Sequence, residues 1–172
     1  MSRAFVKEND LEPAGSDLPE RPQSEHPNYV TPNGLAQLQQ QAARLEGDRQ
    51  QLVPHKDDPV VRQHLATVER DLRYLEGRLE RAIMVDPDRQ STDSVLFGAL
   101  VNLTDENGDR HEYAIVGEDE ADISQHKVSW VSPLARALIG ARLGDSVKWR
   151  RPAGDLELEI TAIRYPAAKE KT

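Results

Sequence analysis

The 172-residue sequence contains no cysteine, which excludes disulfide bonds, thiolate zinc sites and a cysteine nucleophile. Aromatic residues make up only 5% and hydrophobic residues 37%, which is low for one large core and indicates a part exposed to water. The net charge of −8 argues against sequence-specific nucleic-acid binding by the chain itself. No apolar run approaches the roughly 18 residues of a membrane span. The N-terminus MSRAFVKEND lacks the apolar core of a signal peptide, so we expect a cytoplasmic protein with no membrane partner.

The first thirty residues are poor in apolar side chains. Acidic residues outnumber basic ones there, and four prolines interrupt the segment, namely Pro13, Pro19, Pro22 and Pro27. Such a segment buries too little surface to offset the entropy that it loses on ordering. We therefore predict a flexible N-terminal tail over residues 1–30, in which only Ala4-Phe5-Val6 could dock on the rest of the chain or on a partner. A second short tail is expected over residues 167–172.

Two runs between residues 31 and 85 have apolar residues spaced by three and four positions, which is typical of a coiled coil. Thr31 suits the N-cap and Pro32 the first position of the first helix. Pro54 and Pro59 bracket the turn between the runs, because residues before proline avoid helical geometry. The apolar stripe comprises Leu35, Leu38, Ala42, Leu45 and Leu52, with Arg49 in one slot, and Val61, Leu65, Val68, Leu72, Leu75, Leu79 and Ala82. The pattern predicts an antiparallel coiled-coil hairpin over residues 31–85; the alternative is a compact helical bundle.

Residues 86–94, DPDRQSTDS, are predicted to be a linker, and residues 95–166 are rich in strand-forming sequence. The Asn107-Gly108 pair predicts a tight turn between two strands. SPLARALIG predicts a short helix with Ser132 as N-cap, Pro133 at the first position and Gly140 as terminator. The predicted fold class is α+β: a helical hairpin followed by an antiparallel sheet that carries one helix.

The motifs FGA, IVGEDEAD, SPLARALIG, GDSV and PAGDLELEI followed by RY stand in this order between residues 95 and 165. In order and spacing they resemble the C-terminal domain of the GreA/GreB transcript-cleavage factors of bacterial RNA polymerase. The helical runs, opened by TPNGLAQL and closed by RYLEGRLERA, resemble the coiled coil of the same family and stand closer to its GreB branch. The resemblance covers residues 29–166. It implies an FKBP-like C-terminal domain that docks at the rim of the polymerase secondary channel, with the hairpin threaded down the channel.

The turn HKDDPVVRQ, residues 55–63, stands where the family carries an acidic motif of the form G-D-x-S-E-N-A-[ED]-Y. In the family, the acids of this motif are thought to hold the second catalytic Mg²⁺ and to orient the water that cleaves backtracked RNA. Asp57 and Asp58 are present here, but the Gly, the Ser-Glu-Asn-Ala and the Tyr are missing. The hairpin is also about fourteen residues shorter than the GreB pattern, which shortens its reach by about 10 Å.

Asp57 and Asp58 therefore have two interpretations. Carboxylate ligands must come within about 2–2.6 Å of a metal ion, so a shortened hairpin predicts a solvated acidic turn that stops short of the active-centre magnesium. In the alternative, the two aspartates hold Mg²⁺ shared with the polymerase active centre. The resemblance also assigns polymerase docking to the start of the SPLARAL helix, at Ser132, Pro133 and Arg136.

No metal or cofactor of its own is expected for this chain. Its five histidines are scattered without the spacing of metal ligands. An acidic loop contains Glu118, Asp119, Glu120 and Asp122, but the spacing of these acids is not that of a calcium-binding EF-hand.

The leading prediction is a monomeric bacterial accessory factor, not itself an enzyme, that binds RNA polymerase and alters elongation with weak or no stimulation of cleavage. The alternative is an active transcript-cleavage factor. A third reading is regulation of another enzyme through the same C-terminal domain.

Overall fold

The computed structural model describes residues 18–166, which form two compact units. The helical unit contains residues 18–24 and 39–80, and the sheet unit contains residues 25–38 and 81–166. Among the helices of this described part, none has a stretch both long and apolar enough to cross a lipid bilayer.

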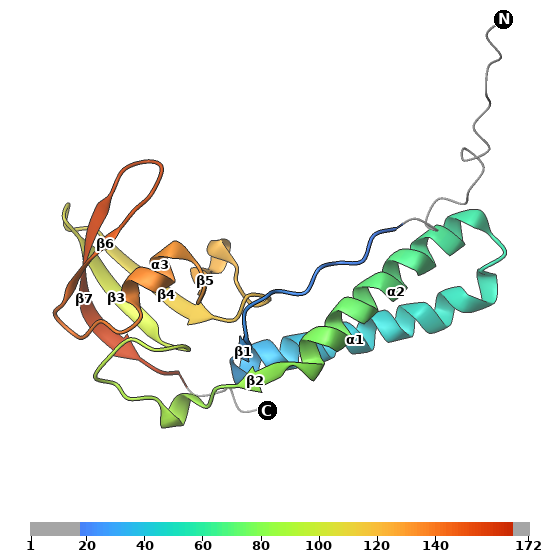
Figure 1. Ribbon diagram of the computed structural model, residues 1–172, viewed down its shortest axis with the longest axis horizontal. Coiled ribbons are helices and arrows are strands. Elements are labelled where there is room, and N and C mark those ends of the chain that lie inside the picture. The colour runs from blue at the N-terminus through green and yellow to red at the C-terminus, as the bar shows by residue number, and fades with distance from the viewer. Residues whose placement is uncertain (1–17, 167–172) are drawn as a thin grey trace, which may run out of the picture. The chain divides into compact units, whose positions relative to one another are not determined.

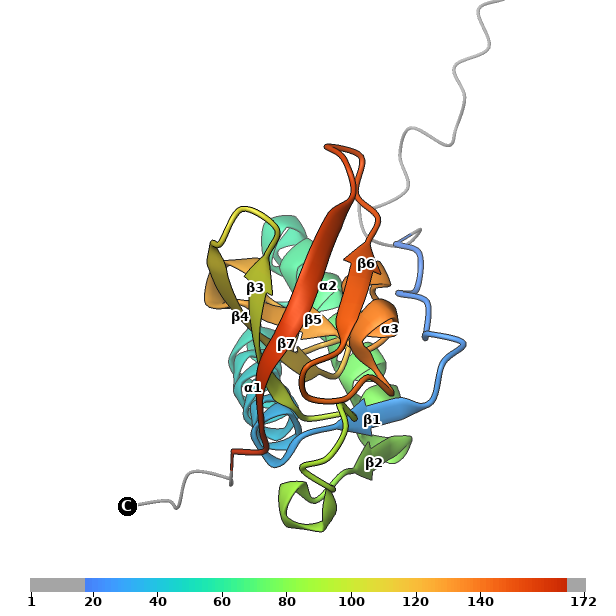
Figure 2. The ribbon, with the colours of Figure 1, turned by 90° about the vertical axis from the view of Figure 1, so that its left-hand side faces the viewer.

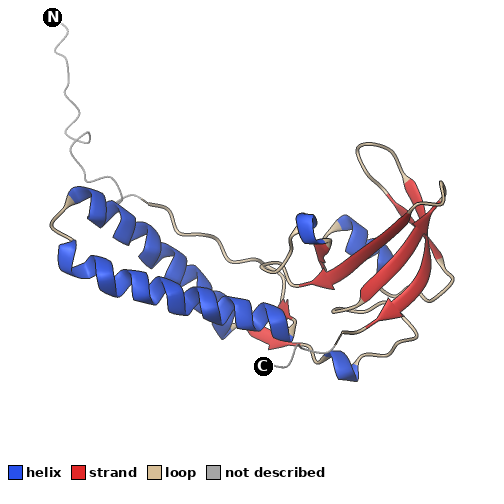
Figure 3. Ribbon diagram, turned by 180° about the vertical axis from the view of Figure 1, so that it is seen from behind, coloured by secondary structure: helices blue, strands red, loops and turns tan. Residues whose placement is uncertain are grey.

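Two long helices form the predicted hairpin. Helix α1 (Pro32–Leu52) and helix α2 (Pro59–Glu80) lie side by side and run in opposite directions, and a short 3-10 turn, η2 (Val53–His55), follows α1 (Figures 1 and 3). Helices α1 and α2 begin at Pro32 and Pro59, whereas Pro54 lies inside η2, two residues beyond the end of α1. The fold class is thus confirmed on its helical side.

The apolar stripe is buried more completely on α2 than on α1. Four of its α2 residues are buried, namely Leu65, Val68, Leu72 and Leu75, whereas Leu38 is the one fully buried α1 leucine. Arg49 occupies the polar slot of the stripe and donates to Glu46 at 2.9–3.2 Å. Since each helix has a single long helical partner in the described residues, the seam stays open to water along one edge.

Residues 18–30 are not the flexible tail that their composition predicts. Residues 20–23 contact α2, and strand β1 (Asn28–Val30) pairs in parallel with strand β2 (Ala82–Met84). The prediction is wrong for these residues because the rest of the chain supplies ion-pair and strand partners that the segment lacks by itself. Residues 1–17, with Ala4-Phe5-Val6, and residues 167–172 lie outside the described part.

A five-stranded sheet forms the centre of the sheet unit, in the order β5-β4-β3-β7-β6. Its strands are β3 (Leu100–Asp105), β4 (Arg110–Val116), β5 (Lys127–Ser129), β6 (Ser146–Trp149) and β7 (Leu156–Arg164). The predicted antiparallel sheet is in fact mixed, because β5 pairs with β4 in parallel. Parallel neighbours need a crossover, and the loop 117–126 with the 3-10 turn η4 (Ile123–Gln125) provides it.

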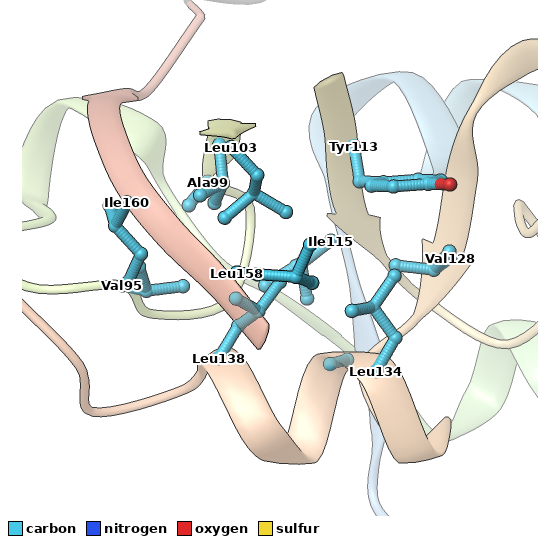
Figure 4. Close-up of a cluster of buried hydrophobic side chains, with 12 residues drawn as sticks. Val95, Ala99, Leu103, Tyr113, Ile115, Val128, Leu134, Leu138, Leu158 and Ile160 are labelled. Atoms are coloured by element: carbon cyan, nitrogen blue, oxygen red, sulfur yellow. The ribbon is translucent and has the colours of Figure 1, made fainter. Parts of the chain in front are cut away.

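The predicted short helix is α3 (Pro133–Leu138), which packs on one face of the sheet (Figure 2). Alternate strand residues point toward it and form the core, which Figure 4 shows. The buried core residues are Val95, Ala99, Val101, Leu103, Tyr113, Ile115, Val128, Leu134, Ala135, Leu138, Leu158 and Ile160.

The predicted turn joins β3 to β4. Gly108 has a φ of 83°, and the Asp105 carboxylate accepts hydrogen bonds from the backbone N–H groups of Asn107 and Asp109. His111 Nε2 lies 2.9 Å from the other Asp105 oxygen, and this contact holds the pKa of Asp105 below its usual value. In the predicted linker 86–94, residues Pro87–Arg89 form the 3-10 turn η3.

The first turn of α1 is fixed by a contact with the acidic loop. Thr31 is the predicted N-cap: its Oγ accepts a hydrogen bond from the Gly34 N–H at 2.9 Å and donates to the Glu120 carboxylate at 2.5 and 3.0 Å. A Cβ atom on Gly34 would lie 3.1 Å from Glu120 Oε1 and 3.3 Å from Thr31 Oγ. A glycine at this position therefore lets the carboxylate approach the helix start.

The two glycines of α1 give a matched test of this contact. Gly47 has open space around its Cα, so Gly47→Ala should stabilise the protein by about 1 kcal/mol, the ordinary helix-propensity gain. Gly34→Ala should forfeit that gain, because its methyl group crowds Glu120, and the two variants should differ by about 1–2 kcal/mol in free energy of unfolding. Urea denaturation followed by circular dichroism measures both. Equal stabilisation by the two substitutions would contradict a close approach at Gly34.

Candidate functional site

The hairpin tip, residues 53–58, contains both predicted aspartates. Asp58 is the residue before α2, and its carbonyl oxygen accepts from the Arg62 N–H at 2.9 Å. Its Oδ1 accepts from the Val60 N–H, also at 2.9 Å, so the side chain satisfies a backbone donor at the helix start. Asp58 therefore has a structural role as a helix cap, which leaves it less available as a ligand.

Asp57 is adjacent, and its side chain is exposed to solvent. Its carbonyl oxygen accepts from Arg62 Nη2 at 3.4 Å. The exposed Lys56 and Arg62 flank the aspartates, so the formal charges of these four side chains cancel at neutral pH. Within residues 18–166 no group of three or more histidines or acids is arranged to hold a metal ion.

The predicted docking residues lie at the start of α3. Ser132 caps the helix as predicted, since its Oγ accepts from the Ala135 N–H at 3.2 Å. Pro133 and Arg136 are exposed, while Leu134 and Leu138 of the same helix point into the core (Figure 4). The helix thus has a buried face that fixes it and an exposed face that a partner can reach. The docking role of these residues stays a prediction.

Two exposed apolar residues near α3 were not singled out from the sequence. Ile139 and Leu143 follow the C-terminal end of the helix and are 36% and 61% exposed. The sequence could have indicated their exposure, because both lie outside any helix or strand, close to the turn at Gly140, where large apolar residues are not easily buried.

The turn that leads into α3 is supported by an aromatic cluster. The Trp130 ring packs edge-on against Tyr29 of β1, with ring centroids 5.1 Å apart, and against His26 at 5.8 Å. The backbone N–H of Trp130 donates to the Val116 carbonyl, and that of Ser132 donates to the Ser129 carbonyl. Residues before position 31 thus help to fix the turn before Ser132, a contribution that their composition did not predict.

Two acids of the acidic loop accept local hydrogen bonds. Glu120 holds Thr31, as described above, and Asp122 Oδ1 accepts from the backbone N–H and hydroxyl of Ser124 at 3.0 and 2.6 Å. The loop therefore acts as a scaffold for the crossover to β5 and for the start of α1.

Comparison with known proteins gives matches over both units. The family model described as "Transcription elongation factor, GreA/GreB, C-term" matches residues 90–165. Transcription elongation factor GreB of Neisseria meningitidis serogroup B is 38% identical over 160 residues, which cover 83% of this chain and 96% of that protein. GreA of Alkalilimnicola ehrlichii is 43% identical over 125 residues, covering 72% and 77%. Among solved structures, GreA factor homolog 1 (Gfh1) of Thermus thermophilus is 27% identical and covers 81% of this chain and 99% of its own, at a TM-score of 0.40.

The capping role of Asp58 can be separated from its charge. Asp58→Ala removes the acceptor for the Val60 N–H and should lower the free energy of unfolding by about 1 kcal/mol. Asp58→Asn removes the charge but keeps a good cap, so its effect should stay within a few tenths of a kcal/mol. Thermal or urea unfolding of the two variants, with Asp57→Ala as the control, decides between cap and charge. Equal losses in the alanine and asparagine variants would show that the charge, not the cap, matters.

Proposed function

Because the chain belongs to the GreA/GreB family of transcription elongation factors, we propose that it binds bacterial RNA polymerase at the secondary channel and regulates elongation. It acts in the cytoplasm as an accessory factor, and any RNA hydrolysis takes place in the polymerase active site. The observation that carries this proposal is the 38% identity to a GreB over 83% of the chain, a share too large for the sheet unit alone. The helical unit is therefore part of what is similar.

A shortened hairpin supports a regulator with weak or no stimulation of cleavage. The alignment with the Neisseria GreB runs over 160 positions but takes in only 83% of these 172 residues, so more than a dozen positions have no counterpart here. We place these positions in the hairpin arms, where the sequence lacks about two heptads of the GreB pattern. With 21 and 22 residues, α1 and α2 are each only about 32 Å long.

The chemistry of the tip supports the same proposal. Mg²⁺ binds through carboxylates and waters, and a competent tip would offer acids whose oxygens are free. Asp58 already caps α2, and Lys56 and Arg62 offset the negative charge beside it. The tip therefore attracts a divalent cation less strongly than two unengaged carboxylates would.

The exposure of Asp57 supports a second candidate function, in which the protein is an active transcript-cleavage factor. Its exposed carboxylate stands at the turn between the helices, where one oxygen ligand could complete a magnesium site that the polymerase mostly supplies. In that case the second cation would stabilise the attacking and leaving oxygens of RNA hydrolysis.

Backtracked elongation complexes distinguish the two candidates. With Mg²⁺ present, we expect the protein to shorten the RNA little or not at all, and the charge-removing Asp57→Asn/Asp58→Asn variant to change this by less than about twofold. If Asp57 is a ligand, the same variant should lower cleavage by about tenfold or more. Asp93→Asn, at an exposed site in the linker, controls for the loss of a surface charge.

Binding is measured in the same complexes. The protein should compete with an active cleavage factor and so suppress the cleavage that this factor stimulates, because both occupy the secondary channel. Lack of competition, together with lack of binding to free polymerase, would refute both candidates.

A further inference from the structure

Residues 18–24, which we call the strap, lie along the outer side of α2 (Figure 1). The Glu20 carboxylate accepts three hydrogen bonds from Arg73, the shortest at 2.6 Å. Arg21 donates to Asp71, and its guanidinium lies 3.8 Å from the centroid of the Tyr74 ring. Glu20 and Arg21 thus each form an ion pair with α2, and Arg21 adds a cation–π contact. The α2 residues involved lie within about one helical turn.

Gly77 leaves room on this side of α2 for the strap of the same chain. Gln23 Nε2 donates to the Tyr74 carbonyl at 3.0 Å, and a Cβ atom on Gly77 would lie 2.7 Å from that nitrogen. A glycine inside a helix weakens it, and packing against α1 does not require one here, because Gly77 lies off the apolar stripe. The strap therefore accounts for a glycine that the hairpin alone does not need.

The strap is held by contacts that break easily. The side chains of Glu20 and Arg73 are 60% and 54% exposed, and that of Arg21 is 42% exposed. Exposed ion pairs contribute little and weaken further with salt. Pro19 and Pro22 restrict the free segment, so little backbone entropy separates the released from the bound strap. The two ion pairs are therefore weak contacts, and because the strap lies off the apolar stripe, it can open while that stripe stays packed.

We propose that the strap is an autoinhibitory latch on the hairpin. This inference rests on the proposed function, in which the hairpin enters the polymerase channel. Closed, the strap adds a third layer of chain to one side of α2 and contacts Arg73 and Tyr74, with Gln23 close to Gly77. The channel wall and the strap then compete for the same side of the helix, and the hairpin engages the polymerase fully when the strap is released.

Full-length variants test the latch in both directions. Glu20→Ala/Arg21→Ala opens the strap without changing the net charge, and should raise the apparent affinity for polymerase by about threefold or more. Because the chain has no cysteine, Glu20→Cys/Arg73→Cys can be cross-linked with a short bis-maleimide to lock the strap closed. The locked protein should bind at least about threefold more weakly than the same variant capped with a mono-maleimide, its matched control.

Hydrogen exchange and circular dichroism accompany the binding assay. The open variant should exchange faster at residues 18–24 and keep the helical content of the wild type. Gly77→Ala, which crowds Gln23 while favouring the helix, is a second opening variant and should shift affinity in the same direction. Weaker binding by the open variants, or equal binding by locked and capped proteins, would overturn the latch. If no form of the protein binds polymerase, the proposed function fails, and the latch fails with it.

Discussion

The hydrogen bonds between Glu120, Thr31 and Gly34 set the residue at which α1 begins, and the rest of the hairpin depends on that point. A helix advances a fixed 1.5 Å per residue, so its first residue and its length determine where its last residue falls. Glu120 belongs to the crossover loop between β4 and β5, and Gly117 of the same loop lies so close to the Tyr29 carbonyl that a side chain would not fit. One loop of the sheet unit therefore positions β1 and the start of α1 together.

The start of α1 and the lengths of the two helices determine which residues form the tip. What the tip can bind then depends on the hydrogen bonds that its own residues make. Asp57 and Asp58 are neighbours in sequence and share a turn, yet their roles differ, because Asp58 completes the backbone hydrogen bonds of α2 and Asp57 does not. A pair of acids in a sequence is thus not equivalent to two free ligands. The first turn of a helix leaves backbone N–H groups without partners inside the helix, and at the start of α2 the Asp58 side chain accepts from one of them.

The parts of the fold that could be predicted from the sequence are those determined within a few residues. Heptad spacing predicted the two long helices, Thr31 and Ser132 were predicted as the caps of α1 and α3, and Asn107-Gly108 predicted the turn between β3 and β4. The parallel pairing of β4 with β5 and of β1 with β2 joins segments by register, which no local pattern encodes. The contact of Thr31 with Glu120 spans 89 residues and was invisible for the same reason. The candidate docking residues followed from family resemblance, because a cap and an exposed arginine are by themselves ordinary features of a short helix.

The N-terminal segment shows why composition alone misjudges order. Judged by its own apolar surface, the segment cannot offset its ordering entropy. That balance changes once a preformed surface supplies the partner: Tyr29 packs on Trp130, the β1 backbone pairs with β2, and Glu20 and Arg21 find opposite charges on α2. The aromatic and strand contacts of residues 26–30 bury surface and are hard to break, whereas the ion pairs of residues 20–21 are exposed and weak. Residues 20–21 are therefore held by weaker contacts than residues 26–30, which is why the proposed latch involves the part of the segment that lies on α2.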